Sequence, residues 1–137
     1  MDMDLVLKFF SSQYDITRAL DEKLSEHQKF ELVQKLFVPS EAQIKQYGVT
    51  QHDRKRYAQP VWLSKFKNLA FSYARQGFFC IPCALFAPEA VGNGGHQLTG
   101  HFGANACRRF KDFTDCWENH SKSKFHQFCL EFYENFI

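Results

Sequence analysis

The sequence lacks several features that would place the protein in a membrane or outside the cell. No apolar run approaches the roughly 20 residues that a membrane-spanning helix needs, so we expect no membrane partner. The N-terminus, MDMDLVLKFFSS, begins with acidic residues and lacks the basic start and small-residue cleavage site of a signal peptide. We therefore expect an intracellular, reducing environment.

The chain also lacks an even number of cysteines and a strong net charge. Five cysteines argue against a framework of disulfides. The formal net charge of +2 permits nucleic-acid binding but does not require it. The charge is unevenly placed, because residues 1–50 hold six Lys/Arg and eight Asp/Glu whereas residues 51–137 hold eleven and seven.

Aromatic side chains, by contrast, are abundant. The 137 residues include 16 phenylalanines and are 45% hydrophobic, which is enough for one aromatic core. All the cysteines and five of the six histidines follow a break at Tyr47-Gly48. We therefore divide the chain into a helical N-terminal segment, residues 1–47, and a Cys/His-bearing domain, residues 48–137.

The spacing of apolar residues predicts an α+β fold. Helical spacing runs from Asp15 to Phe37, with a capping box at Ser25 and Gln28, and a short helix is expected at residues 3–12. The elements expected after the break are a short helix from Trp62 leading into a strand, a β-hairpin of residues 71–73 and 78–86, a glycine-rich loop at 87–100, and helices at 104–117 and 123–136.

Four residues have the chemistry and the spacing of a metal site. Cys80 and Cys83 form a C-x2-C pair in the expected hairpin, and His120 and His126 follow after an interval of 36 residues, at a helix end and the start of the next helix. Zinc binds two thiolates and two imidazoles in a tetrahedron, and the order of cysteines and histidines matches a ββα finger. The interval is longer than the usual dozen residues, so the expected fold is an elaborated, zinc-stapled finger.

Two other interpretations of the cysteine pair stay open. A redox pair would lie at a helix N-terminus after a strand in a βαβ unit, which the sequence does not indicate. The pair could also be buried core residues without a metal. If one of the four ligands is wrong, Cys116 or His101 is the candidate substitute, whereas Cys107 and Cys129 lie on apolar helical faces and are expected in the core.

Several ordered blocks of sequence resemble the TTF-type zinc finger of hAT-family transposases and of proteins derived from them. The resemblance covers roughly residues 54–130, and the matching blocks are RYAQPVWL from Arg56, FKNLAFS from Phe66, FCIPCALF from Phe79, GHF from Gly100, Trp117, and HSKSKFH from His120. It implies that Cys80, Cys83, His120 and His126 bind zinc and that the domain binds double-stranded DNA such as a transposon end, and hence a nuclear location.

The resemblance also implies what this chain should not do. In those transposases a long RNase H-like catalytic domain follows the finger, and the chain ends at Ile137 without one. We therefore expect no enzymatic activity, and a detached, truncated or domesticated DNA-binding module. The main rival is a zinc-stabilised protein-interaction module, in which the N-terminal helices and the surplus of aromatic residues form the interface.

Eight basic residues are the candidates for contacts with DNA. They are Arg54, Lys55, Arg56, Arg108, Arg109, Lys111, Lys122 and Lys124. Most contacts of this kind are with phosphates and carry no sequence information. We expect Arg108 and Arg109, at the start of a helix, to be able to contact guanine.

Overall fold

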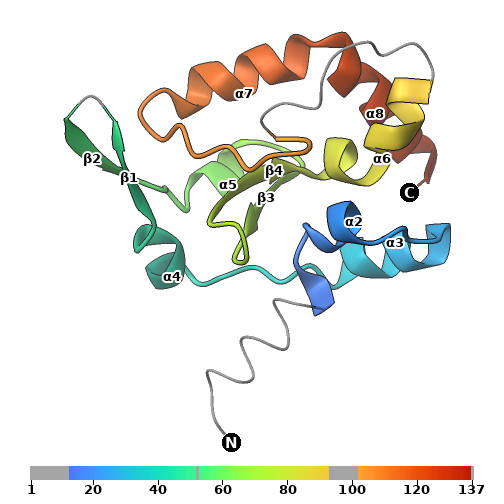
Figure 1. Ribbon diagram of the computed structural model, residues 1–137, viewed down its shortest axis with the longest axis horizontal. Coiled ribbons are helices and arrows are strands. Elements are labelled where there is room, and N and C mark those ends of the chain that lie inside the picture. The colour runs from blue at the N-terminus through green and yellow to red at the C-terminus, as the bar shows by residue number, and fades with distance from the viewer. Residues whose placement is uncertain (1–12, 52, 93–101, 137) are drawn as a thin grey trace, which may run out of the picture.

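The computed structural model describes residues 13–51, 53–92 and 102–136, and it confirms the α+β class. The described helices are α2 (Arg18–Asp21), α3 (Glu26–Gln34), α4 (Glu41–Lys45), α5 (Trp62–Lys65), α6 (Ile81–Gly92), α7 (Phe113–Lys122) and α8 (Lys124–Phe136). The strands form two antiparallel hairpins, β1 (Gly48–Gln51) with β2 (Arg54–Tyr57) and β3 (Leu69–Ser72) with β4 (Gly77–Cys80). Figure 1 shows α7 on one side of the β3–β4 hairpin and α2 and α3 on the other.

The N-terminal helices begin where serine side chains cap them. The Ser25 hydroxyl accepts the Gln28 N–H, and the Gln28 side chain accepts the Ser25 N–H, which confirms the predicted capping box. Ser40 and Gln43 repeat this arrangement at α4. The short helix expected at residues 3–12 lies outside the described residues.

Both parts of the chain contribute to one hydrophobic core. Leu32 and Ile44 are 0% and 1% exposed and belong to the same cluster as Phe78 and Phe113. The division of the chain near residue 48 stays a prediction, but the structure places N-terminal side chains directly in the core of the second part.

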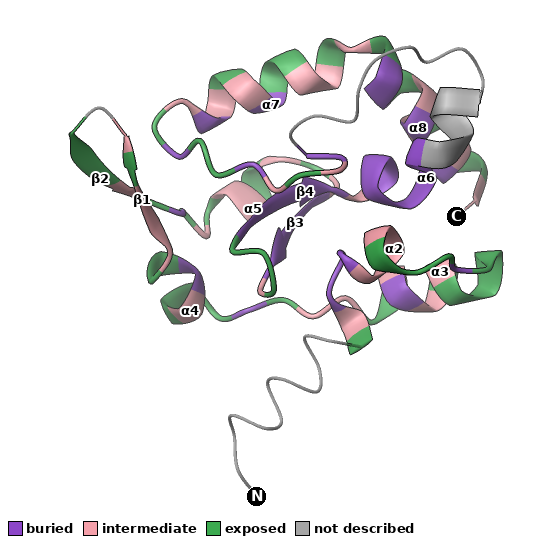
Figure 2. Cartoon of the chain, in the orientation of Figure 1, coloured by how far each residue is buried: buried purple, intermediate pink, exposed green. Residues whose placement is uncertain are grey.

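The β3–β4 hairpin lies at the centre of this core. All eight of its residues are buried, as the purple strands in Figure 2 show. Its turn, at Gln76 (φ 55°), confirms the hairpin expected there. Around it, the indole of Trp62 stacks on Phe113 at a centroid distance of 4.2 Å and meets Phe78 edge-on at 5.4 Å.

The second strand of this hairpin is shorter than predicted. The expectation of a strand over residues 78–86 is wrong after Cys80, because α6 begins at Ile81. The run IPCALF is apolar throughout, so its pattern cannot distinguish a buried strand from a buried helix. Pro82 falls in the first helical turn, where a backbone N–H is not needed. The expected loop at 87–100 is likewise wrong up to Gly92, where α6 ends, and residues 93–101 lie outside the described part.

The helix expected from residue 104 begins only at Phe113. Residues before it pair with the central hairpin instead: Cys107 donates its N–H to the Phe78 carbonyl (2.8 Å) and accepts the Phe78 N–H (3.0 Å). These two bonds hold Cys107 in an extended conformation, although its spacing from Phe110 and Phe113 suits a helix. The helix expected at 123–136 is confirmed as α8.

The β1–β2 hairpin was not predicted from the sequence. It pairs Gly48 with Tyr57 and Gln51 with Arg54, and Asp53 at its turn has a left-handed φ of 61°. None of the described helices is long and apolar enough to cross a membrane.

Candidate metal centre

Both cysteines of the candidate site are placed by the junction of a strand and a helix. Cys80 is the last residue of β4, and Cys83 lies in the first turn of α6. The step from strand to helix at Ile81 brings the two thiols to one side of the chain. The N-terminal end of a helix also favours negative charge, which suits a thiolate at Cys83.

Both histidines are placed by the break between two helices. His120 lies in the last turn of α7, and His126 in the first turn of α8. Ser123 shapes the break, because its hydroxyl donates to the His120 carbonyl (2.8 Å) and accepts the His126 N–H (3.1 Å). The predicted position of the two imidazoles, at a helix end and the start of the next helix, is confirmed.

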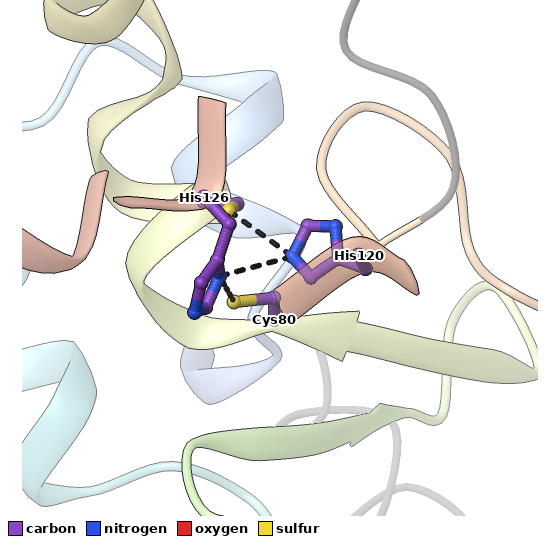
Figure 3. Close-up of side chains that lie close together, drawn as sticks. Cys80, His120 and His126 are labelled. Carbon is purple, nitrogen blue, oxygen red and sulfur yellow. Dashed lines mark hydrogen bonds between the residues drawn. The ribbon is translucent and has the colours of Figure 1, made fainter. Parts of the chain in front are cut away.

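The four side chains converge on one point, and Figure 3 shows three of them. Their ligand atoms all lie within 4.8 Å of one another. The two imidazole nitrogens, His126 Nδ1 and His120 Nε2, are 3.2 Å apart. The sulfur–nitrogen distances are 3.4 Å from Cys80 to His126, 3.3 Å from Cys83 to His120 and 3.6 Å from Cys83 to His126.

These distances fit the edges of a zinc tetrahedron. Zinc–sulfur bonds of about 2.3 Å and zinc–nitrogen bonds of about 2.05 Å imply nitrogen–nitrogen edges of about 3.3 Å and sulfur–nitrogen edges of about 3.6 Å. The four measured edges agree with these values to within about 0.3 Å. The group could therefore hold one metal ion.

The site is closed to solvent on most sides. Cys80 and Cys83 are 0% exposed and His126 is 6% exposed. The ring of Phe102, itself 1% exposed, packs on His120 at a centroid distance of 5.1 Å, and Trp117 lies 5.6 Å from the same imidazole. Four protein ligands in a buried, aromatic surrounding are typical of a structural metal site, because a catalytic site keeps one position open.

The surroundings shift the pKa values of the two thiols in opposite directions. Burial raises the pKa of Cys80, but hydrogen bonds from Cys83, His120 and His126 outweigh burial and hold that pKa well below its ordinary value. The pKa of Cys83 is raised, first by hydrogen bonding with Cys129 and Cys80 and then by burial. A bound divalent cation would reverse the preference of Cys83, because a coordinating thiol is deprotonated outright.

The remaining cysteines lie outside the group of four. Cys107 and Cys129 are 0% exposed, so the expectation that they belong to the core is confirmed. Cys129 nevertheless lies close enough to the site to be the first cause of the raised pKa of Cys83, which the sequence did not reveal. Cys116 is half-buried and hydrogen bonds with Cys107 instead, and His101 lies outside the described residues.

The redox interpretation gains one feature that was not expected. The cysteine pair does lie at a helix N-terminus directly after a strand, contrary to the prediction. The strand, however, belongs to an antiparallel hairpin rather than a βαβ unit. Both thiols also lie beside imidazole nitrogens, at the separations expected for two ligands of one metal ion. A dithiol exchange site does not need such imidazoles.

The structure separates the candidate DNA-binding residues into two places. Arg54, Lys55 and Arg56 lie on β2, and the expectation that Arg108, Arg109 and Lys111 open a helix is wrong, because they precede α7. These two clusters are neighbours, since the Lys111 N–H donates to the side chain of Gln51 on β1 (3.1 Å). Lys122 and Lys124 are exposed at the opposite end of α7, about 15 Å away along the helix.

The two arginines before α7 are not equivalent. Arg109 forms an ion pair with Asp112 at 2.6 Å, which reduces its availability to a ligand. The side-chain stem of Arg108 lies over Gly77 at the β3–β4 turn, where an added Cβ would be 2.8 Å from Arg108 Cγ.

Comparisons with known proteins found no similar protein. No family model matches the chain, and neither a curated protein nor a solved structure matches it.

Proposed function

We propose that the chain is a zinc-dependent module that binds double-stranded DNA, similar to the TTF-type N-terminal finger of hAT transposases. The observation that supports it most is the convergence of Cys80, Cys83, His120 and His126 within 4.8 Å. The sequence resemblance implies the same four residues as ligands.

Zinc suits this group better than other common ions. Two thiolates and two imidazoles are soft or borderline ligands, which exclude magnesium and calcium, and a tetrahedral S2N2 set is typical of zinc. A metal ion here would tie β4 and α6 to α7 and α8, which are separated by a long stretch of chain. Structural zinc can contribute roughly 10 kcal/mol or more to folding.

The proposed ligand of the protein is DNA because six of the eight candidate cations lie on β2 or in the segment beside it that precedes α7. Of the eight candidate basic residues, all but Arg56 are exposed, and Arg56 is half-buried. Cations of this kind neutralise phosphates and release counterions on binding. The closed metal site offers no position for a substrate, which favours binding over catalysis, and DNA binding implies a nuclear location.

The first test is metal content with and without chelation. We expect one zinc ion per chain in protein purified without chelator, and loss of the cooperative thermal transition after EDTA. Re-addition of zinc, but not magnesium, should restore the transition. Metal-free protein with an unchanged melting temperature would contradict the zinc proposal.

The second test measures DNA binding as a function of salt. The affinity for a random 30-base-pair duplex should fall steeply between about 50 and 200 mM salt, because each neutralised phosphate contributes to the slope. Arg108→Ala should lower the slope by about one unit. Zinc-loaded protein that binds no duplex at 50 mM salt would refute the DNA proposal while leaving the metal site intact.

A protein-interaction module is the second candidate, and one surface feature favours it. Val38 and Val61 are 66% and 61% exposed and line the same hollow between the N-terminal segment and α5. Exposed aliphatic residues that share a hollow can bind an apolar partner. Binding at such a surface should depend little on salt, which separates it from DNA binding.

A further inference from the structure

The β1–β2 hairpin has two faces with different surroundings. Residues directly opposite each other in an antiparallel pair point to the same side. The register therefore places Val49 and Gln51, with Arg54 and Arg56, on one face. It places Gly48, Thr50, Lys55 and Tyr57 on the other.

The first of these faces is turned toward the protein. Val49 packs against the hydrophobic core. Gln51 accepts the Lys111 N–H with its side-chain oxygen at 3.1 Å. This face is thus anchored to the protein at Val49 and Gln51, and of its two arginines Arg56 is half-buried whereas Arg54, at the tip, is exposed.

The second face is turned to solvent, and we call Thr50, Lys55 and Tyr57 the outer face. All three residues are exposed, Tyr57 by 44%. Figure 1 shows that the hairpin projects from one end of the molecule, beyond the other hairpin and α5. No described helix or strand covers this face.

Two side chains of the outer face, Lys55 and Tyr57, contact each other above Gly48. The Tyr57 ring lies over Gly48, so that an added Cβ there would come within 2.8 Å of two ring atoms and 3.0 Å of Lys55 Cε. The Lys55 ammonium lies 5.7 Å from the centre of the same ring. Such pre-positioning reduces the entropy lost on binding.

The size and charge of the hairpin suit one groove of DNA. Four-residue strands span about 13 Å, and the major groove, about 12 Å wide, admits a two-stranded β-ribbon. Among the described residues no carboxylate pairs with Arg54, Lys55 or Arg56. The hairpin therefore presents two exposed cations without carboxylate partners, Arg54 at its tip and Lys55 on the outer face, whereas Arg56 is half-buried.

We propose that the outer face of the β1–β2 hairpin enters the major groove of double-stranded DNA and distinguishes its base pairs. In this arrangement the Lys55 ammonium donates to acceptors on guanine, and the Thr50 side chain contacts the neighbouring base edge. Arg54, at the tip, binds a phosphate and sets the register. The inference rests on the proposed DNA binding and assigns base recognition to this hairpin rather than to α7.

The test is a selection of bound sequences from a pool of double-stranded DNA with 20 randomised base pairs. Zinc-loaded full-length chain should enrich a sequence motif, and Lys55→Ala and Thr50→Ala should each reduce preference at one or two of its positions by about 5-fold or more. The matched control is Lys122→Ala, which removes the same charge at the far end of α7 and should leave the motif unchanged.

A second variant tests geometry without changing charge. Gly48→Ala should displace the Tyr57 ring and Lys55, and so reduce the base preference at the same positions of the motif. Zinc content and melting temperature show whether the variant folds. If Lys55 only neutralised phosphates, Gly48→Ala would leave the motif intact.

The outcomes separate the two proposals. A motif that is identical for wild type, Lys55→Ala and Thr50→Ala, or a wild type that binds duplexes without preference, overturns the role of the hairpin but not DNA binding. Stronger binding to single-stranded competitor than to duplex also overturns it. A zinc-loaded wild type that binds no DNA at all overturns both.

Discussion

Replacement of Asp15 should destabilise the whole protein, because its buried carboxylate joins the N-terminal segment to the central hairpin. The residue is 2% exposed. Its two oxygens accept five hydrogen bonds, from the Thr17 N–H (3.0 Å) and hydroxyl (2.6 Å), the Ser72 hydroxyl (2.8 Å), and the N–H groups of Tyr73 (2.8 Å) and Ala74 (3.3 Å).

The magnitude follows from how many of these donors lose contact with water. Three of the five hydrogen bonds are buried and two are partly buried. An unpaired buried donor costs about 1–3 kcal/mol, so Asp15→Ala should lower the free energy of unfolding by about 3 kcal/mol or more. That is a large part of the 5–15 kcal/mol typical of a domain. Thr17→Val removes one buried bond and should cost only about 1 kcal/mol.

Urea unfolding followed by tryptophan fluorescence measures this difference. With a slope of about 1.5 kcal/mol per molar urea, Asp15→Ala should lower the midpoint by about 2 M, and Thr17→Val by well under 1 M. A midpoint within about 0.3 M of wild type for Asp15→Ala would refute the reasoning, since the donors would then find other partners. A separate early transition would instead show that the N-terminal segment unfolds on its own.

Three further predictions concern the core, a helix terminus and the ligands. Phe113→Ala should lower the free energy of unfolding by about 3–5 kcal/mol in the same assay, and Phe113→Leu by much less, because the ring is fully buried. Ser25→Ala should cost about 1 kcal/mol, since α3 loses its capping box; a loss above about 2 kcal/mol would indicate a further role. Cys80→Ser should lower zinc bound per chain, measured by atomic absorption, whereas Cys116→Ser should retain it; equal retention would contradict the ligand assignment.

The four residues of the candidate metal centre could be predicted because the signals of each pair are local. A C-x2-C pair places two sulfurs within reach of one ion wherever the chain turns, and here the turn is the step from β4 into α6. The five residues between His120 and His126 include Ser123, a residue type that favours helix caps. Neither feature depends on which other elements pack nearby.

The segment before α7 could not be predicted in the same way. The spacing of Cys107, Phe110 and Phe113 suits one face of a helix, yet Cys107 is extended because it pairs with Phe78, far away in sequence. A non-local backbone pairing of this kind overrides local periodicity and leaves no mark in the pattern of apolar residues.

The β1–β2 hairpin was missed for a different reason. Strand β2 is RKRY, which is depleted in the β-branched residues that favour strands, and only Val49 of β1 packs on the core. The cluster of three cations was visible in the sequence, but which of them face solvent and which face the protein was not. The structure supplies that information through Gln51, which turns one face inward and leaves the other exposed.

The candidate metal centre and the β1–β2 hairpin are connected through residues 102–111. The Cys80 N–H donates to the Phe102 carbonyl at 2.8 Å, Cys107 pairs with β4, and Lys111 binds Gln51. A metal ion bound by these four residues would hold the end of β4 and, through these bonds, the strip of chain on which the hairpin rests. If the chain binds DNA as proposed, its affinity for DNA would then depend on the metal without any ligand residue facing DNA, because the ion would act by holding this strip in place rather than by supplying charge at the interface.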